Sequence, residues 1–294
     1  MTQRAAQRNC GRGTHTRRRK AEGVSETPAV QVDVVQQAAD RLQTAARTGV
    51  PCRPVRDLID RDDVAAAYAV QQRLTAARVA GGASIIGRKV GLTSVAVQEQ
   101  LGVDQPDFGV LFDDMRYLGG DTVPYDAVLQ PRVEAEIAFV LAHDLEDGDL
   151  DLPQVRAAVD YAVAALEICG SRVANWDISF ADTVADNASS GAFVLGPLRR
   201  RLHEFEPGDV TMTMSVTGHE ESAGSGRACL GDPLLAVQWL ARRARDLGDP
   251  LRAGQIVLSG ALGPMRPVDK GAQVVATLSG LGRVAVSFDE GNRS

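Results

Sequence analysis

Residues 131–141 read PRVEAEIAFVL, and we expect the fold to be built around this segment. A proline at its entry and the apolar, β-branched and aromatic residues that follow predict a β-strand. Side chains alternate between strand faces, so Glu134 and Glu136 share one face. Paired carboxylates on a buried strand repel each other and are costly to desolvate. A divalent cation relieves both costs, and ligands that are all oxygen favour Mg²⁺ or Mn²⁺. A solvated strand face is the alternative, which the apolar run disfavours.

A third carboxylate, Glu167, lies in the small and apolar segment 161–170. It is the only charged residue between Asp160 and Arg172. Such an acid is either at an exposed edge or committed to a partner. Three carboxylates on one ion leave roughly three octahedral positions for water and a chelating substrate. Glu134, Glu136 and Glu167 are therefore the candidate metal ligands.

The amino-acid composition and the charge limit the classes of protein to which this chain can belong. The chain has 294 residues, of which 44% are hydrophobic and 24% charged, as in ordinary globular proteins. Its net charge is −6, although residues 1–20 hold seven basic side chains and no acid. The remaining chain is therefore acidic, which argues against nucleic-acid binding. No apolar stretch approaches the roughly 20 residues of a membrane span. The four cysteines lack CxxC spacing and fit the reducing cytoplasm.

Three regions follow from the pattern along the chain. Residues 1–30 predict a disordered basic extension, because they offer little apolar surface. Residues 31–83 predict two helices, the first closed by Gly49 and the second by Gly81–Gly82. Residues 84–290 predict a mostly β catalytic domain with inserted helices. The overall fold class is therefore α+β.

Two further segments complete the prediction. Apolar residues at helical spacing predict a helix over residues 151–166. Residues 177–191 are rich in small polar side chains and predict a loop that lines the site.

Several segments together resemble the 2-keto-4-pentenoate hydratase (2-hydroxypenta-2,4-dienoate hydratase) family of the fumarylacetoacetate hydrolase superfamily. The resemblance covers about residues 33–288. The segments that carry it are GRKVGLTS (87–94), QLGVDQPDFGVLFDDM (100–115), LQPRVEAEIAFVL (129–141), ALEICGSR (165–172), DTVADNASSG (182–191) and SGALGPM (259–265).

The resemblance implies a β-roll catalytic domain preceded by a small helical region, a homo-oligomer, and Mg²⁺ or Mn²⁺ on the ExE pair and Glu167. It also implies a hydro-lyase of the meta-cleavage breakdown of aromatic compounds. Such an enzyme adds water to 2-hydroxypenta-2,4-dienoate and gives 4-hydroxy-2-oxopentanoate. Association with a pathway decarboxylase or aldolase is a further implied partnership.

Lys89 and Asp107 are the candidate catalytic residues, for proton transfer and for positioning water. The chain has 32 basic residues and only three are lysines, which is consistent with a specific need for an ammonium at Lys89. Without the surrounding motifs, Lys89 reads as a surface lysine and Asp107 as a turn residue. Ser189 is the candidate for binding the substrate carboxylate. A 4-oxalocrotonate-type decarboxylase, a carbon–carbon hydrolase of the same superfamily and a weakly active partner subunit remain alternatives.

Overall fold

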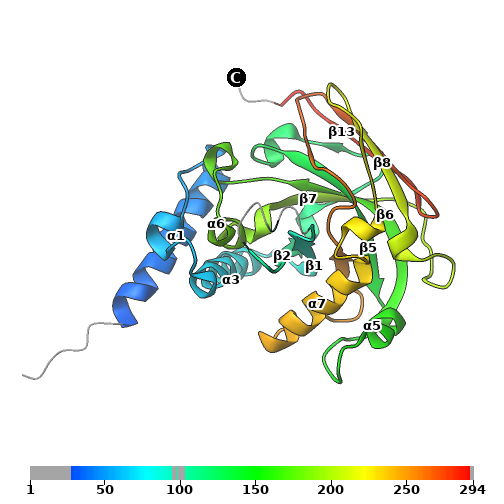
Figure 1. Ribbon diagram of the computed structural model, residues 1–294. Helices are drawn as coiled ribbons and strands as arrows, with labels where there is room; N and C mark the ends of the chain where they lie inside the picture. The colour runs from blue at the N-terminus through cyan, green and yellow to red at the C-terminus, as the bar shows by residue number, and fades with distance from the viewer. Residues whose placement is uncertain (1–27, 95–97, 99–102, 292–294) are drawn as a thin grey trace, which may run out of the picture.

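The computed structural model describes residues 28–94, 98 and 103–291 (Figure 1). The helices are α1 (Pro28–Thr48), α2 (Arg56–Ile59), α3 (Val64–Ala80), α5 (Leu152–Ala158), α6 (Phe180–Ala185) and α7 (Pro233–Asp246). The strands are β1 (Ile85–Gly91), β2 (Asp107–Phe112), β3 (Arg116–Leu118), β4 (Thr122–Val123), β5 (Arg132–Leu141), β6 (Val159–Cys169), β7 (Ser190–Leu195), β8 (Thr211–Val216), β9 (Ser222–Ser225), β10 (Ile256–Leu258), β11 (Arg266–Pro267), β12 (Gln273–Leu278) and β13 (Gly282–Phe288).

Two sheets form the body of the molecule. The larger has the strand order β2-β1-β10-β5-β6-β7-β3, with β11 paired to β5, and the smaller has the order β4-β13-β12-β8-β9. Strands β12 and β13 pack on β6, so the smaller sheet covers one face of the larger (Figure 1). Val133, Ile137 and Phe139 of β5 enter the core shared with Val274 and Val286. The opposite face of β5 carries the two glutamates.

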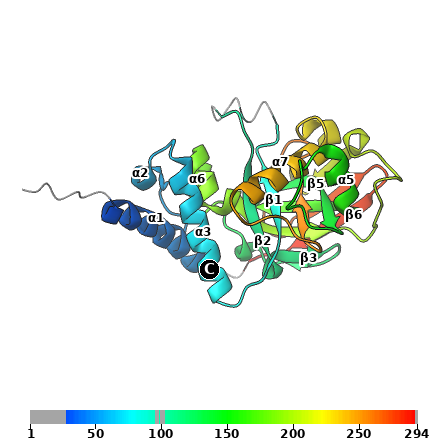
Figure 2. The same cartoon turned by 90° about the horizontal axis from the view of Figure 1, so that it is seen from below.

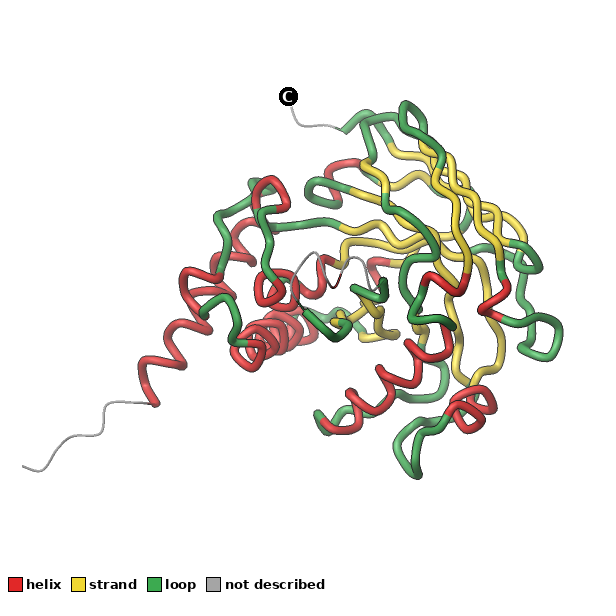
Figure 3. Tube along the Cα trace, in the orientation of Figure 1, coloured by secondary structure: helices red, strands yellow, loops and turns green. Residues whose placement is uncertain are grey.

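A layer of helices lies beside the sheets, built from α1, α3 and α6 (Figures 2 and 3). Gln71 of α3 donates 2.9 Å hydrogen bonds to the backbone oxygens of Phe108 and Val184, which ties the helix to β2 and α6. Arg56 of α2 forms an ion pair with the buried Asp182 of α6. These contacts hold the N-terminal helices against the elements that carry Asp107 and the segment around Ser189.

The α+β class and the two N-terminal helices are confirmed. The first helix ends at Thr48 before Gly49, and Asp63 caps the second by accepting from the Ala66 backbone N–H. The predicted extension, residues 1–30, lies outside the described residues except for Pro28–Val30, which belong to α1. In the part of the chain that the structure describes, no helix has both the length and the apolar character needed to cross a membrane.

The prediction of a helix over residues 151–166 was wrong in its second half. Helix α5 stops at Ala158, and Val159–Cys169 is the central strand β6. A strand buried on both faces shows a continuous apolar run, which spacing alone does not separate from a buried helix. The predicted loop over residues 177–191 was also incomplete, because it contains the buried helix α6 and the start of β7.

Candidate active site

The pairing of β5 with β6 brings the predicted carboxylates together. The two strands are antiparallel, and Glu134 lies directly opposite Glu167. Glu136 lies two residues further along the same face of β5. Glu136 and Glu167 are both fully buried, with 0% of their surface exposed. The site therefore concentrates negative charge inside the sheet, away from water.

Several oxygens of this cluster lack hydrogen-bond partners. Glu136 accepts from the Gly260 backbone N–H through Oε2 at 2.8 Å, but its Oε1 is buried without a partner. Both carboxylate oxygens of Glu167 are likewise without hydrogen bonds. Burial and the neighbouring charge of Glu167 raise the pKa of Glu134 to about 7 and raise that of Glu136 as well. Buried carboxylate oxygens of this kind are stabilised by a cation or by a proton.

Lys89 supplies part of the compensating charge. Its Nζ lies 3.2 Å from Glu167 Oε1, and only 3% of the residue is exposed. Burial by itself lowers the pKa of Lys89, but Glu167 and the other nearby acids raise it overall, so the side chain stays an ammonium. One ammonium does not balance three carboxylates. The donor set therefore fits a divalent cation as well.

Asp107 lies beside Lys89 because β1 and β2 pair in antiparallel register, with Gly91 opposite Asp107. A Cβ added at Gly91 would lie 2.2 Å from Asp107 Oδ1 and 3.2 Å from Lys89 Nζ. Only glycine at this position lets both groups approach the same point. Asp107 is 1% exposed, its Oδ1 has no hydrogen-bond partner, and burial raises its pKa although Lys89 opposes that shift.

Thr183 connects Asp107 to Ser189, and sequence reasoning did not identify it. Its Oγ1 donates to Asp107 Oδ2 at 3.4 Å and lies 3.1 Å from Ser189 Oγ. A threonine within a polar segment carries no signal of its own. Only the folding of α6 against β2 makes it a neighbour of Asp107.

The turn that carries Ser189 is strained. Asn187, Ala188 and Ser189 have φ values of 56°, 50° and 56°, in the left-handed region, which costs about 1–2 kcal/mol for a residue such as Ala188 or Ser189. Asn187 holds the turn on β2, because its amide donates to the Val110 oxygen and its oxygen accepts the Val110 N–H. Such strain, held by surrounding contacts, is typical of functional sites.

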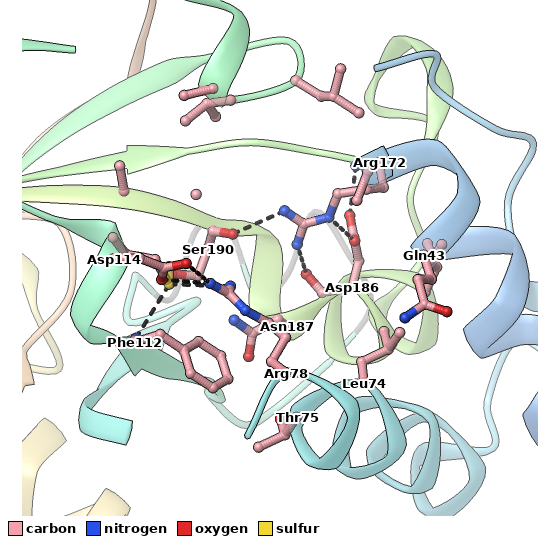
Figure 4. A pocket seen from close by; sticks show the side chains of 18 of the residues that line it. Gln43, Leu74, Thr75, Arg78, Phe112, Asp114, Arg172, Asp186, Asn187 and Ser190 are labelled. Carbon is pink, nitrogen blue, oxygen red and sulfur yellow. Dashed lines mark hydrogen bonds and ion pairs between the residues drawn. The ribbon is translucent and has the colours of Figure 1, made fainter. Parts of the chain in front are cut away.

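Arg172 clamps the same turn from the other side (Figure 4). Its guanidinium donates to the Asp186 carboxylate, to the Asp186 backbone oxygen at 2.7 Å and to the Ser190 backbone oxygen at 3.0 Å. The two ends of the turn are thereby fixed by one side chain. The position of Ser189 is set by this clamp rather than by local preference.

Among the described residues, Glu134, Glu167 and Cys169 form a group that could hold a metal ion, with ligand atoms within 4.8 Å of one another. Cys169 follows Glu167 by two residues on β6, and its Sγ lies 3.6 Å from Glu134 Oε1. Burial raises the pKa of the Cys169 thiol. Glu136 is not in this group but lies close enough for Glu134 and Glu167 to raise its pKa. The role of Glu134, Glu136 and Glu167 as metal ligands stays a prediction.

Comparison with known proteins places this site in context. Residues 84–288 match the fumarylacetoacetate (FAA) hydrolase C-terminal family. A protein named TodF product hydratase, from Pseudomonas putida (strain F1), is 51% identical over 265 residues, which cover 90% of this chain and 99% of the relative. A 2-keto-4-pentenoate hydratase of Paraburkholderia xenovorans (strain LB400) is 49% identical over 86% of this chain and 94% of the relative.

A solved structure shares the fold over most of the chain. The 4-oxalocrotonate decarboxylase from Pseudomonas putida G7, complexed with magnesium and adipate, matches with a TM-score of 0.83 and 31% sequence identity. The match covers 88% of this chain and 98% of that one. The same decarboxylase has also been solved with calcium and acetate.

Proposed function

We propose that this chain, which belongs to the fumarylacetoacetate hydrolase family, is a 2-keto-4-pentenoate hydratase of a meta-cleavage pathway. The reaction adds water to 2-hydroxypenta-2,4-dienoate and gives 4-hydroxy-2-oxopentanoate. Two relatives, one named TodF product hydratase and the other 2-keto-4-pentenoate hydratase, are about half identical over nearly their full length and support the assignment. Within the site, the observation that supports this assignment is the buried cluster of three carboxylates that faces Lys89 and Asp107.

Glu134, Glu136 and Glu167 are the residues that would hold the cation, and we propose Mg²⁺ or Mn²⁺. Carboxylate oxygens are hard ligands, those of Glu167 and Oε1 of Glu136 have no hydrogen-bond partner, and the related decarboxylase was solved with magnesium. When bound, such an ion acts as a Lewis acid towards the carboxylate and the 2-oxygen of the substrate. The thiol of Cys169, a softer metal ligand than a carboxylate, lies next to Glu134 and Glu167.

Lys89 would stabilise the negative charge that develops on the substrate, and Asp107 would transfer protons. The reaction moves the proton of the 2-hydroxyl group to C5, and water then adds its oxygen to C4 and a proton to C3. Negative charge develops on the 2-oxygen during both stages, and the Lys89 ammonium stabilises it. Asp107, with one oxygen free of hydrogen bonds, accepts and returns the protons and orients the water.

Thr183 couples substrate binding to Asp107. A threonine hydroxyl has one proton to donate, and in this structure it goes to Asp107. The contact between Thr183 and Ser189 must then use the Ser189 proton. When Ser189 donates to the substrate carboxylate instead, Thr183 can turn its proton to Ser189. Asp107 then loses a hydrogen bond and becomes the stronger proton acceptor.

We further propose a homo-oligomer in the cytoplasm. The described cysteines, Cys52, Cys169 and Cys229, are free thiols, as a reducing compartment allows. Association with a decarboxylase or aldolase of the same pathway is the further proposed partnership. Sedimentation of the purified chain, alone and with a candidate partner, tests both proposals.

The deciding experiment supplies the purified chain with Mn²⁺ and 2-hydroxypenta-2,4-dienoate and identifies the product by NMR. We expect 4-hydroxy-2-oxopentanoate with no release of carbon dioxide. The second arm supplies 4-oxalocrotonate, since the solved relative of similar fold is a decarboxylase. Faster carbon dioxide release in that arm than hydration in the first would assign the chain to the decarboxylases. Turnover by the chain alone excludes the alternative of a weakly active partner subunit.

A further inference from the structure

A cavity of about 440 Å³ lies on the reverse side of the strands that carry Lys89 and Asp107. It is bounded by α3, β1, β2 and α7, and Figures 1 and 2 show these four elements next to one another. In the β1–β2 pair, Arg88 lies opposite Val110, and Lys89 lies opposite Gly109. Because side chains alternate along a strand, Arg88 faces away from the catalytic side.

The walls of this cavity are mostly apolar. Phe108 and Val110 of β2 and Ile85 of β1 line it, together with Val79 of α3 and Leu247 after α7. Val79 is 46% exposed and Leu247 is 39% exposed. They are two of the five large hydrophobic side chains that are exposed in the described part of the chain. Exposed apolar side chains gathered around one cavity are typical of a binding site.

A buried cation lies within this apolar lining. Arg88 is 3% exposed and donates through Nη2 to the carboxylate of Asp249, whose side chain is 71% exposed. Its Nη1 is buried and has no hydrogen-bond partner among the described residues. An unsatisfied N–H of a buried charged group destabilises the protein unless an acceptor reaches it. Among the residues that line the cavity, Asp249 is the one acid.

We propose that this cavity binds a monocarboxylate with an apolar body, such as a medium-chain fatty acid or an aromatic acid. The carboxylate accepts from Arg88 Nη1, and the body packs on Phe108, Ile85 and Val79. The volume lies within the usual range for small-molecule sites. A cationic ligand is excluded by Arg88, and a short polar anion leaves the apolar walls in contact with water.

Ligand binding in this cavity can be followed by tryptophan fluorescence. Phe108 packs edge-on to Trp239, with ring centroids 6.4 Å apart. The chain has one other tryptophan, Trp176, which stacks on Arg132. In a Trp176→Phe background, the fluorescence therefore reports only on Trp239. Arg88 and Phe108 are also the chain neighbours of Lys89 and Asp107, so an occupied cavity contacts the same two strands as the substrate.

The experiment titrates the full-length, metal-free protein with sodium octanoate and follows heat and Trp239 fluorescence. Octylamine has the same tail with the opposite charge, and acetate has the same head without the tail. We expect saturable binding of octanoate, and at least about tenfold weaker binding of both comparison compounds. Absence of saturable octanoate binding, or equal binding of octylamine, overturns the proposal.

Two variants test separately the contribution of the Arg88 charge and the contribution of the space inside the cavity. Arg88→Met removes the charge, and Ala76→Phe fills the cavity from the exposed surface of α3 while leaving Arg88 intact. Each should weaken octanoate binding at least about tenfold, and Leu118→Ala, at an exposed site outside the cavity, should not. If Arg88→Met fails to fold, Ala76→Phe decides.

A second copy of this chain is the competing occupant of the cavity. Val79→Asp in sedimentation experiments distinguishes it. If that variant dissociates the oligomer and the wild type binds no octanoate, the cavity is an interface between copies and the proposal is wrong.

Discussion

Glu136→Gln tests the metal site most directly, because it removes one charge and keeps the shape of the side chain. The glutamine oxygen can still accept the Gly260 N–H, which lies 2.8 Å from Glu136 Oε2. The new amide N–H group takes the place of Oε1, which has no partner. In the metal-free protein it can donate to a neighbouring carboxylate. An ionisable group between mutually repelling carboxylates is thus replaced by a neutral hydrogen-bond donor.

The expected effect on the metal-free protein is stabilisation. A hydrogen bond to a charged group contributes about 1.5–3 kcal/mol. For a chain of this size, that corresponds to a rise in Tm of roughly 3–12 °C. Burial and the charges of Glu167 and Glu134 raise the pKa of Glu136, and removal of this ionisable group acts in the same direction.

The expected effect on the metal is the opposite. Loss of a group that only orients a ligand typically lowers metal affinity by about 10- to 100-fold, so loss of a ligand charge should exceed about 100-fold. At an Mn²⁺ concentration 100 times the wild-type Kd, the wild type gains about 2.7 kcal/mol of stability. The variant, then near its own Kd, gains about 0.4 kcal/mol.

Thermal unfolding with a chelator and with Mn²⁺, together with calorimetric titration of Mn²⁺, measures both quantities. Glu220→Gln, at an exposed position, is the matched control and should change neither. The reasoning is refuted if the metal-free Glu136→Gln protein is less stable than the wild type, or if both gain equally from Mn²⁺. Glu136 would then be an acceptor for Gly260 and not a metal ligand.

The other predictions concern turnover. Lys89→Met should lower kcat by about 100-fold or more, because the charge near the developing enolate is lost, whereas a few-fold change would make Lys89 structural. Asp107→Asn should lower kcat by about 10²- to 10⁴-fold with a smaller change in KM, and a change confined to KM would contradict proton transfer. Thr183→Val should lower kcat by about tenfold, because Ser189 loses the hydrogen bond that Thr183 donates to it when substrate is bound, and Thr183→Ser should restore it; failure of serine to restore the rate would assign Thr183 to packing.

The sequence identified the three carboxylates but not strand β6, whose pairing with β5 brings them together. Alternation along residues 131–141 correctly placed Glu134 and Glu136 on one face, because that face lies opposite an apolar one. Glu167 was identified as the third acid from its apolar surroundings. The strand that carries it was predicted as a helix, since alanine-rich apolar runs fit both periods.

Local pattern thus determined the α+β class, the N-terminal helices and the candidate acids, because helix caps and strand alternation act over a few residues. Tertiary structure alone decided which groups meet. The antiparallel register set Glu134 opposite Glu167, and the β1–β2 pairing set Lys89 beside Asp107. Thr183 reaches Asp107, and the Ser189 turn keeps its strained form, only through contacts between segments distant in sequence. Such contacts depend on how whole elements pack, which no short stretch of sequence records.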